Sequence, residues 1–199
     1  MSDTTNKQSN SDVNAAGKEV NRNSSVDRAL TPIRKLYYAW IPVVIVILDL
    51  VTKYWASHWL KKQPDGKVPV LGDSVTFTYL ENRGAAWGML QGKINFFVIL
   101  TAILIVLFLF LVARIPSVRK YRPLLFSFLM VIGGAFGNLY ERIFQGYVTD
   151  FISFDIIRFP VFNVADIFVT CSFALLMILL LFRYSEKELS FLPFFGSDK

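Results

Sequence analysis

The chain has 199 residues, of which 54% are hydrophobic and only 18% are charged, and its mean hydropathy is +0.45. A soluble domain is usually about 45–50% apolar with roughly a quarter of its residues charged, so the composition excludes an ordinary soluble globular protein. The net charge of +6 would suit a nucleic-acid partner, but the basic residues lie beside apolar runs, which favours a membrane protein instead.

Residues 1–35 are rich in Ser, Asn, Asp and Lys and contain almost no large apolar residue. Such a segment cannot bury enough apolar surface to offset the entropy lost on ordering, so it is predicted to be a disordered tail. The first apolar run begins too late, and is too long, to be the apolar region of a cleaved signal peptide. We therefore interpret that run as an uncleaved membrane anchor.

Four apolar runs are each long enough to cross a bilayer as a helix, which takes roughly 20 residues. They cover residues 36–60, 94–113, 123–140 and 164–182. The second and third runs contain no charged residue, and the fourth contains only Asp166. The third run carries Gly133, Gly134 and Gly137, small residues that let helices approach closely inside a membrane. The sequence therefore predicts an all-α membrane protein with four transmembrane helices.

The basic residues of the short loop between the second and third runs predict the orientation in the membrane. These residues, which have no acidic residue among them, are Arg114, Arg119, Lys120 and Arg122. Because Lys and Arg concentrate in cytoplasmic loops, we expect this loop and both termini in the cytoplasm. Lys61, Lys62 and Lys67, in the loop between the first and second runs, would then lie outside, which opposes the assignment, but four spans place both ends on one side. Residues 1–35 and 184–199 are thus predicted to be cytoplasmic tails of a membrane domain, 36–183.

The loop after the first run is predicted to be structured. Residues 67–71 and 75–79 indicate short strands on either side of the turn-rich triplet 72–74. Residues 83–90 are predicted to form an interfacial loop or short helix, with Trp87 at the level of the lipid headgroups. We expect a small extracytoplasmic β element that rests on the membrane surface above the four helices.

Two aspartates are predicted to lie at the same outer interface. Asp150 lies in the outer loop 141–163, shortly after the third run and beside several phenylalanines, and Asp166 opens the fourth run. Carboxylates at membrane depth are costly and are functional candidates by default. Two that lie close together cannot easily both ionise, so they share a proton and titrate as a pair. One could then activate a water while the other donates to a peptide carbonyl, as in an aspartic protease.

Neighbouring polar residues support this hypothesis, although each also has a structural explanation. The amides of Asn138 and Asn163 can donate and accept, so they could orient a carboxylate or hold a substrate carbonyl, and Arg142 could pair with a carboxylate. However, Asn163 is also a good N-cap for the fourth run, and the helix dipole alone favours an acid such as Asp166 there. Asp150 could equally be an ordinary acidic residue of a loop.

The first run contains an ion-pair motif. Asp49 and Lys53 lie four residues apart on one helix face, with the acid N-terminal to the base, which is the better order. A structural packing pair explains them as well as direct catalysis does. The only histidine, His58, lies in no cluster with metal-ligand spacing, so neither a metal nor a cofactor is predicted. Cys171, the only cysteine, cannot form a disulfide within one chain.

Together these residues lie in motifs that resemble the lipoprotein signal peptidase, or signal peptidase II, family. In chain order the motifs are Asp49-x-x-Thr52-Lys53, Glu81-Asn82-x-Gly84-Ala85-Ala86-Trp87-Gly88, Gly133-Gly134-Ala135-x-Gly137-Asn138 followed by Glu141-Arg142, Gly146-x-Val148-x-Asp150-Phe151, and Phe162-Asn163-x-Ala165-Asp166. The resemblance runs from about Tyr38 to Phe182, which is all of the chain except its tails. Several separate motifs in the family order make a chance match untenable.

The resemblance implies an aspartyl endopeptidase of the bacterial plasma membrane with its active site at the outer face. It would remove signal peptides from diacylglyceryl-modified prolipoproteins by cleaving on the amino side of the lipid-modified cysteine. The implied partners are these substrates, membrane lipid and globomycin-type inhibitors, with no nucleic acid. The implied catalytic pair is Asp150 and Asp166. The implied supporting residues are Asp49, Lys53, Asn82, Gly84, Asn138, Arg142, Asn163 and Ala165.

Two residues depart from the family pattern. Glu141 stands where the family usually has Asp, and Trp87 stands where Phe is common. The extra methylene of a glutamate is absorbed more easily by a supporting residue than by a catalytic one, so Glu141 is left out of the predicted catalytic set.

Two other classes of function compete with this hypothesis. In a transporter or proton-conducting bundle, Asp49, Asp150 and Asp166 would form a relay, but transport folds often show internal repeats, and these runs do not repeat. A non-catalytic membrane scaffold would leave the interfacial acids and asparagines without a purpose. Cleavage of a prolipoprotein by the purified protein, with and without globomycin, would separate the three.

Overall fold

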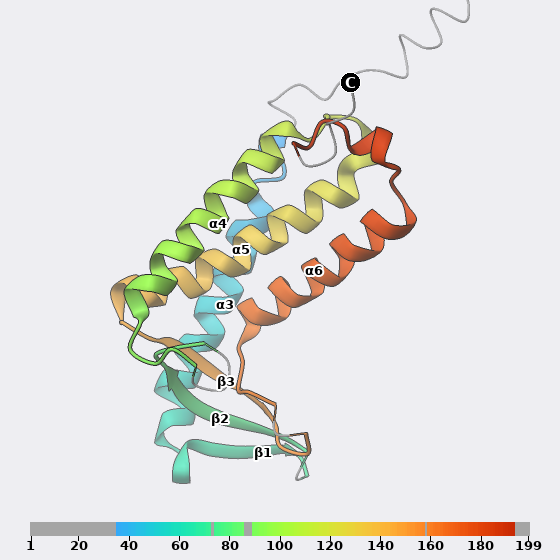
Figure 1. Cartoon of the computed structure of the whole chain (residues 1–199). Coiled ribbons are helices and arrows are strands. Elements are labelled where there is room, and N and C mark those ends of the chain that lie inside the picture. The colour runs from blue at the N-terminus through green and yellow to red at the C-terminus, as the bar shows by residue number, and fades with distance from the viewer. Residues whose placement is uncertain (1–34, 73, 86–88, 158, 194–199) are drawn as a thin grey trace, which may run out of the picture.

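The computed structural model describes residues 35–72, 74–85, 89–157 and 159–193. Within these ranges the chain forms four long helices, one small sheet and several short 3₁₀ turns (Figure 1). The helices are α3 (Trp40–His58), α4 (Ile94–Arg114), α5 (Arg122–Phe144) and α6 (Val164–Phe182). All four are long and apolar enough to cross a membrane, which confirms the predicted spans. The predicted N-terminal tail up to residue 34 and Trp87 lie outside the described residues.

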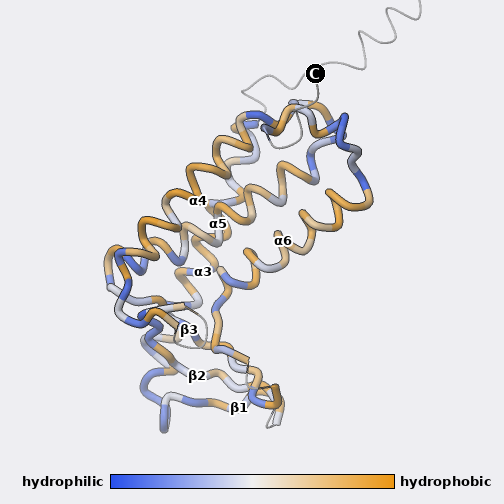
Figure 2. The backbone as a smooth tube through the Cα atoms, viewed as in Figure 1, coloured by the Kyte–Doolittle hydropathy of each residue, from blue (hydrophilic) through white to orange (hydrophobic). Residues whose placement is uncertain are grey.

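Helix α5 is the central helix of the bundle. It packs against α3, α4 and α6, and 61% of its most apolar stretch is buried, compared with 28% or less for each of the other three. The other helices therefore direct most of their apolar side chains outward. Figure 2 shows hydrophobic residues along the middle of the helices, with hydrophilic residues gathered at the two ends.

Three glycines of α5 lie where α3 and α6 approach it closely. A Cβ atom added at Gly133 would lie 2.9 Å from Cβ of Ile45 on α3, and one added at Gly134 would lie 2.7 Å from the carbonyl oxygen of Ala165 on α6. Gly137 faces α3 again, where an added Cβ would lie 2.3 Å from Oδ2 of Asp49. These positions need glycine because larger residues would hold the three helices apart.

The residues after α6 pack back onto the end of the bundle away from the sheet. Leu189 and Leu192 are buried in the helical core, and the ring of Tyr184 stacks on that of Tyr121 at a centroid distance of 5.5 Å. Glu188 forms an ion pair with Lys120 in the loop between α4 and α5. This segment therefore ties the end of α6 to the start of α5.

The sheet is antiparallel, with the strand order β1-β2-β3. Its strands are β1 (Lys67–Leu71), β2 (Val75–Asn82) and β3 (Val148–Phe154). The first two confirm the predicted strands, with β2 three residues longer than expected. The described residues of 83–90 form bends and turns, so they take the loop alternative.

Strand β3 was not predicted, because its sequence lacks the alternation of a half-buried strand. Its first four residues are all buried, since β2 pairs with one edge while Phe162 bridges to Ile152 on the other. Because Thr149 and Asp150 are polar although they are buried, the sequence shows neither alternation nor the continuous apolar run that would predict a strand. The interpretation of 141–163 as a plain outer loop was therefore wrong for the part that carries Asp150.

An aromatic cluster fixes the sheet to the end of α3. The ring of Trp55 contacts Phe77 of β2 and Phe151 of β3 edge-on, at centroid distances of 5.4 and 6.1 Å, and Ala56 and Leu60 are buried beneath them. The sheet thus lies beyond one end of the helices, opposite the end at which the loop between α4 and α5 lies (Figure 1). It is held where α3 and α5 end and where α6 begins.

We expect Gly137→Ala to destabilise the protein by about 1–3 kcal/mol through overpacking, with a further loss because the displaced Asp49 carboxylate faces buried partners. The measurement is the unfolding midpoint in detergent. Phe136→Leu, at a partly exposed position of the same helix, is the control and should change the midpoint little. Equal midpoints for Gly137→Ala and the wild type would contradict the close contact with Asp49.

Candidate active site

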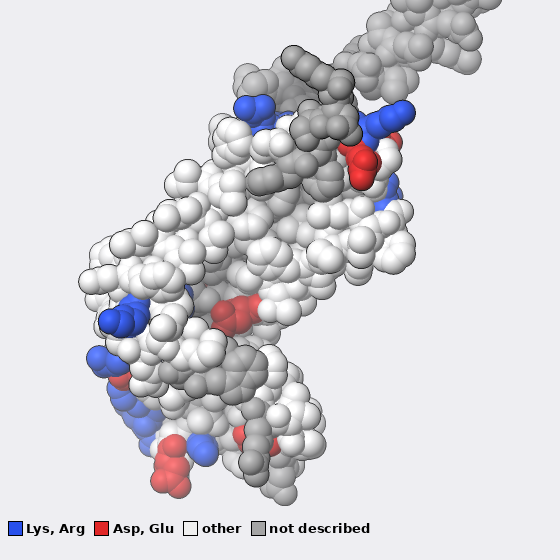
Figure 3. All heavy atoms as spheres, viewed as in Figure 1, with Lys and Arg blue, Asp and Glu red and all other residues white. Residues whose placement is uncertain are grey.

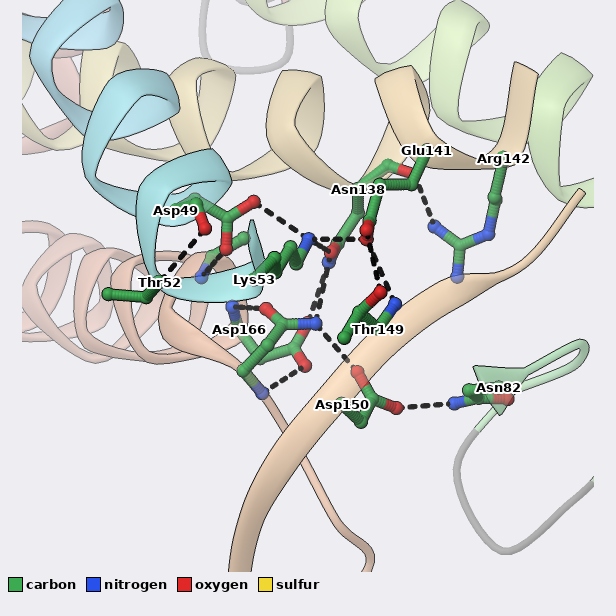
Figure 4. A network of polar contacts seen from close by, with 12 residues as sticks. Asp49, Thr52, Lys53, Asn82, Asn138, Glu141, Arg142, Thr149, Asp150 and Asp166 are labelled. Carbon is green, nitrogen blue, oxygen red and sulfur yellow. Dashed lines mark hydrogen bonds and ion pairs between the residues drawn. The ribbon is translucent and has the colours of Figure 1, made fainter. Parts of the chain in front are cut away.

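The predicted site residues converge where the helices meet the sheet. Asp150 comes from the middle of β3, where it is 2% exposed, and Asp166 is the third residue of α6. Figure 4 shows both carboxylates in one network of polar contacts with side chains of α3 and α5. In Figure 3, acidic atoms lie in a hollow between the uncharged surface of the helices and the sheet.

The register of the sheet places Asn82 beside Asp150. Asn82 pairs with Val148 across the strands, so Asp150, two residues further on, is its diagonal neighbour on the same face. The Nδ2 group of Asn82 donates to Oδ2 of Asp150 at 2.8 Å. In turn, the backbone N–H of Gly84 donates to Oδ1 of Asn82 at 2.9 Å, which fixes the orientation of the amide.

Asn163 holds both aspartates. Its Oδ1 accepts from the backbone N–H of Asp166 at 3.1 Å, and Oδ2 of Asp166 accepts from the backbone N–H of Asn163 at 3.2 Å, which makes a capping box for α6. Its Nδ2 donates to Oδ1 of Asp150 at 2.7 Å. The cap and the site are therefore built from the same side chain.

Asn138 completes the link between the carboxylates. Its Nδ2 donates to Oδ1 of Asp166 at 2.7 Å, while its Oδ1 accepts from Nδ2 of Asn163 at 3.1 Å and from Nζ of Lys53 at 2.8 Å. Asp150 and Asp166 are thus joined through two amides that hydrogen-bond to each other.

Lys53 lies at the buried end of this network. Its Nζ is 2.7 Å from Oδ2 of Asp49 and 3.1 Å from Oε2 of Glu141, and none of the three side chains is more than 2% exposed. The other oxygen of Asp49, Oδ1, accepts from the backbone N–H of Ala165 at 2.8 Å. The Asp49–Lys53 pair therefore connects α3 to α5 and to the first turn of α6.

Glu141 connects the same lysine to β3. Its Oε2 accepts from the backbone N–H of Thr149 at 2.9 Å, and its Oε1 accepts from the hydroxyl of Thr149 at 2.8 Å. Thr149 directly precedes Asp150, so Glu141 helps to position Asp150. Glu141 is also the residue that stands where the family usually has Asp. Sequence reasoning missed Thr149, and its one signal was its place next to Asp150.

Arg142 lies at the edge of the site. Within the described residues it forms no ion pair; one Nη1–H donates to the backbone oxygen of Asn138 at 3.5 Å, and Nε is buried without a hydrogen bond. Its guanidinium lies over the ring of Phe97 at 5.4 Å. The expected pairing of Arg142 with a carboxylate is therefore not made.

A cavity of about 520 Å³ opens onto the two aspartates. Its polar wall includes both carboxylates and Arg142, and its apolar wall includes Phe154, Phe162 and Ile167. A concave apolar site with a few convergent polar groups is the usual form of a ligand-binding site. Within the described residues, no three His, Cys, Asp or Glu side chains are grouped as metal ligands.

Burial raises the pKa of Asp150 to about 7, and the nearby charge of Asp166 acts in the same direction. The hydrogen bonds from Asn82 and Asn163 act against this rise because they stabilise the carboxylate. Near neutral pH, Asp150 can therefore hold or release a proton. This is the property that an acid–base pair needs.

Comparison with known proteins agrees with this geometry. The model of the family described as signal peptidase (SPase) II matches residues 41–182. The lipoprotein signal peptidase of Caldanaerobacter subterraneus subsp. tengcongensis is 40% identical over 144 residues, which are 72% of this chain and 94% of that protein. The chain belongs to the signal peptidase II family.

One further relative and one solved structure are similar to this chain over most of their length. The lipoprotein signal peptidase of Francisella tularensis subsp. novicida is 35% identical over 160 residues, covering 77% of this chain and 96% of that protein. A bacterial membrane enzyme solved by the in meso method at 1.9 Å resolution superposes with a TM-score of 0.63 and 29% identity, over 78% of this chain and 97% of that one. The protein is accordingly a multi-pass membrane aspartic peptidase that acts on prolipoproteins.

We expect Thr149→Val to reduce stability by about 1–3 kcal/mol, because a buried oxygen of Glu141 loses its donor while the shape of the side chain is kept. Thr149→Ser keeps the hydroxyl and is expected to lose less. Unfolding of both purified variants in detergent measures the difference. A Thr149→Ser variant that is less stable than Thr149→Val would show that packing, rather than this hydrogen bond, dominates at the position.

Proposed function

We propose that Asp150 and Asp166 are the catalytic dyad of this signal peptidase II. The observation that carries the proposal is the buried carboxylate of Asp150 and the half-buried carboxylate of Asp166, which are held by linked amides and line one cavity. Together they share one proton, which the burial of Asp150 favours on that residue.

In this mechanism the ionised carboxylate takes a proton from a water, whose oxygen attacks the carbonyl carbon of the scissile peptide bond. The protonated carboxyl group donates its proton to the carbonyl oxygen, which gives a neutral gem-diol. When the C–N bond breaks, the nitrogen receives a proton from the dyad, and the diol returns one to it. The products are a carboxyl group and a free amine, and the dyad again holds a single proton.

The substrate is, we propose, a prolipoprotein whose cysteine already carries a diacylglyceryl group, cleaved on the amino side of that cysteine. The cavity supports this assignment because its apolar wall, with Phe154 and Ile167, adjoins the polar end that holds the dyad. Acyl chains would lie against the apolar wall and in lipid, while the peptide bond meets the carboxylates. Globomycin-type inhibitors are expected to occupy the same cavity.

We propose that the site faces the outer side of the bacterial plasma membrane and that both termini are cytoplasmic. The loop that carries Arg114, Arg119 and Arg122 lies at the end of the bundle opposite the sheet, and basic loops of this kind remain in the cytoplasm. At the outer interface the dyad has access to water, which the centre of the bilayer lacks.

Asp150→Asn and Asp166→Asn are each expected to lower the cleavage rate by at least about a thousandfold, because an amide cannot exchange a proton with water or substrate. Both variants should still insert and fold. Asp155→Asn is the matched control, since Asp155 is an exposed acid just after β3 and should keep the wild-type rate. Substantial turnover of a lipid-modified prolipoprotein by either dyad variant would rule out the assignment.

Cleavage is expected to follow a bell-shaped pH profile. The rate should rise at acidic pH as one member of the dyad ionises, and fall as pH increases through the raised pKa of Asp150, about 7, because the acid is then lost. Initial rates with a diacylglyceryl-modified substrate, with folding checked at each pH, provide the measurement. A rate that keeps increasing into the alkaline range would contradict a carboxylic acid donor.

A further inference from the structure

The three asparagines of the site share one arrangement. In each, the side-chain oxygen is held by a group that can only donate, so the NH₂ group must point the other way. The donor-only groups are Nζ of Lys53 for Asn138, the backbone N–H of Asp166 for Asn163, and the backbone N–H of Gly84 for Asn82. The three NH₂ groups consequently all donate to the carboxylates of the dyad.

Lys53 differs from the other two anchors because it is a side chain and it is charged. Its ammonium has three protons, and its three neighbours are oxygens of Asp49, Glu141 and Asn138 at 2.7, 3.1 and 2.8 Å. An ammonium group has no acceptor, so the Asn138 amide cannot turn its NH₂ group toward Lys53. Figure 4 shows Lys53 between Asp49 and Asn138, and its side chain is 2% exposed.

We propose that Lys53 is a positioning residue that fixes the polarity of the Asn138 amide, and through it the hydrogen bond that holds Asp166 for catalysis. This proposal rests on the proposed dyad and goes beyond it, because Lys53 acts on the reaction without touching substrate or either carboxylate of the dyad. Without Lys53, the Asn138 oxygen keeps only the longer hydrogen bond from Nδ2 of Asn163, at 3.1 Å, so the amide can turn its oxygen toward Asp166 more readily. That orientation suits only a protonated carboxyl group.

The charged groups around the dyad are Asp49 and Lys53 from α3 and Glu141 and Arg142 from α5. A change at Lys53 alone would alter the net charge and leave two carboxylates short of a partner, which often prevents folding. Asp49→Asn/Lys53→Met avoids the first effect and limits the second to Glu141. It keeps the net charge, the amide oxygen introduced at position 49 can still accept from the backbone N–H of Ala165, and Glu141 retains both donors of Thr149.

The first readout is the rate and pH profile of prolipoprotein cleavage. For Asp49→Asn/Lys53→Met we expect kcat to fall about 10- to 100-fold, with KM changed less than about threefold, because one interaction with the reacting group is lost. Both limbs of the pH profile should shift to higher pH, since the ionised dyad has lost a donor. Lys61→Met is the matched control: Lys61 pairs with Glu81 on the surface, and the profile should not move.

A double-mutant cycle separates this role from general support of the fold. The variant that combines Asn138→Ala with Asp49→Asn/Lys53→Met is expected to have the same kcat as Asn138→Ala alone, because Lys53 acts through that amide. Lys53→Arg keeps a donor-only cation and should keep the wild-type pH profile even where crowding lowers the rate. The proposal would be overturned if the losses in kcat were additive, if the pH profile of Asp49→Asn/Lys53→Met did not move, or if that of Lys53→Arg shifted.

A second readout does not depend on activity. In protein labelled with ¹⁵N-asparagine, the side-chain amide of Asn138 is assigned by its absence from Asn138→Ala. Its protons should exchange at least about tenfold faster in Asp49→Asn/Lys53→Met, while those of Asn82 stay unchanged, and equal exchange would overturn the proposal. If the wild-type protein failed to cleave prolipoproteins, the proposed function would fall, and this exchange measurement would still decide the role of Lys53.

Discussion

The burial of one ammonium group organises this end of the molecule. An isolated charge in an apolar interior is very costly, so Lys53 must be surrounded by oxygens. Those oxygens come from Asp49, Glu141 and Asn138, on two helices. The helices can meet closely enough only because Gly137 leaves room for the Asp49 carboxylate. Helix packing and the geometry of the site are therefore consequences of the same requirement.

The same hydrogen bonds serve structure and chemistry. From the sequence, an N-cap role for Asn163 and a catalytic setting for Asp166 are alternatives. In the structure they are one arrangement, because the oxygen of Asn163 caps α6 while its NH₂ group holds Asp150. A residue that stabilises a helix end also has a fixed orientation, and a fixed orientation is what a reacting carboxylate needs from its neighbours.

The sequence predicts those features that depend on short spacings. Four spans follow from the lengths of the apolar runs, and the Asp49–Lys53 pair follows from its four-residue separation. The contacts that sequence reasoning missed either join segments that are distant in the chain or involve segments whose sequence shows no periodic pattern. Lys53 meets Asn138 across 85 residues of chain, Glu141 reaches Thr149 on a strand without alternation, and the residues after α6 show no motif.

The indirect path from Lys53 to the dyad fits the proposed chemistry. A cation in direct contact with Asp150 would favour the ionised carboxylate and oppose the rise of its pKa that burial causes. The dyad would then have difficulty retaining its shared proton near neutral pH. The neutral amides between Lys53 and the carboxylates fix the orientation of the carboxylates, while the distance they add weakens the electrostatic effect of the Lys53 charge on them. Asn138 and Asn163 thus let one buried cation fix the geometry of the site while the pair remains able to hold a single proton.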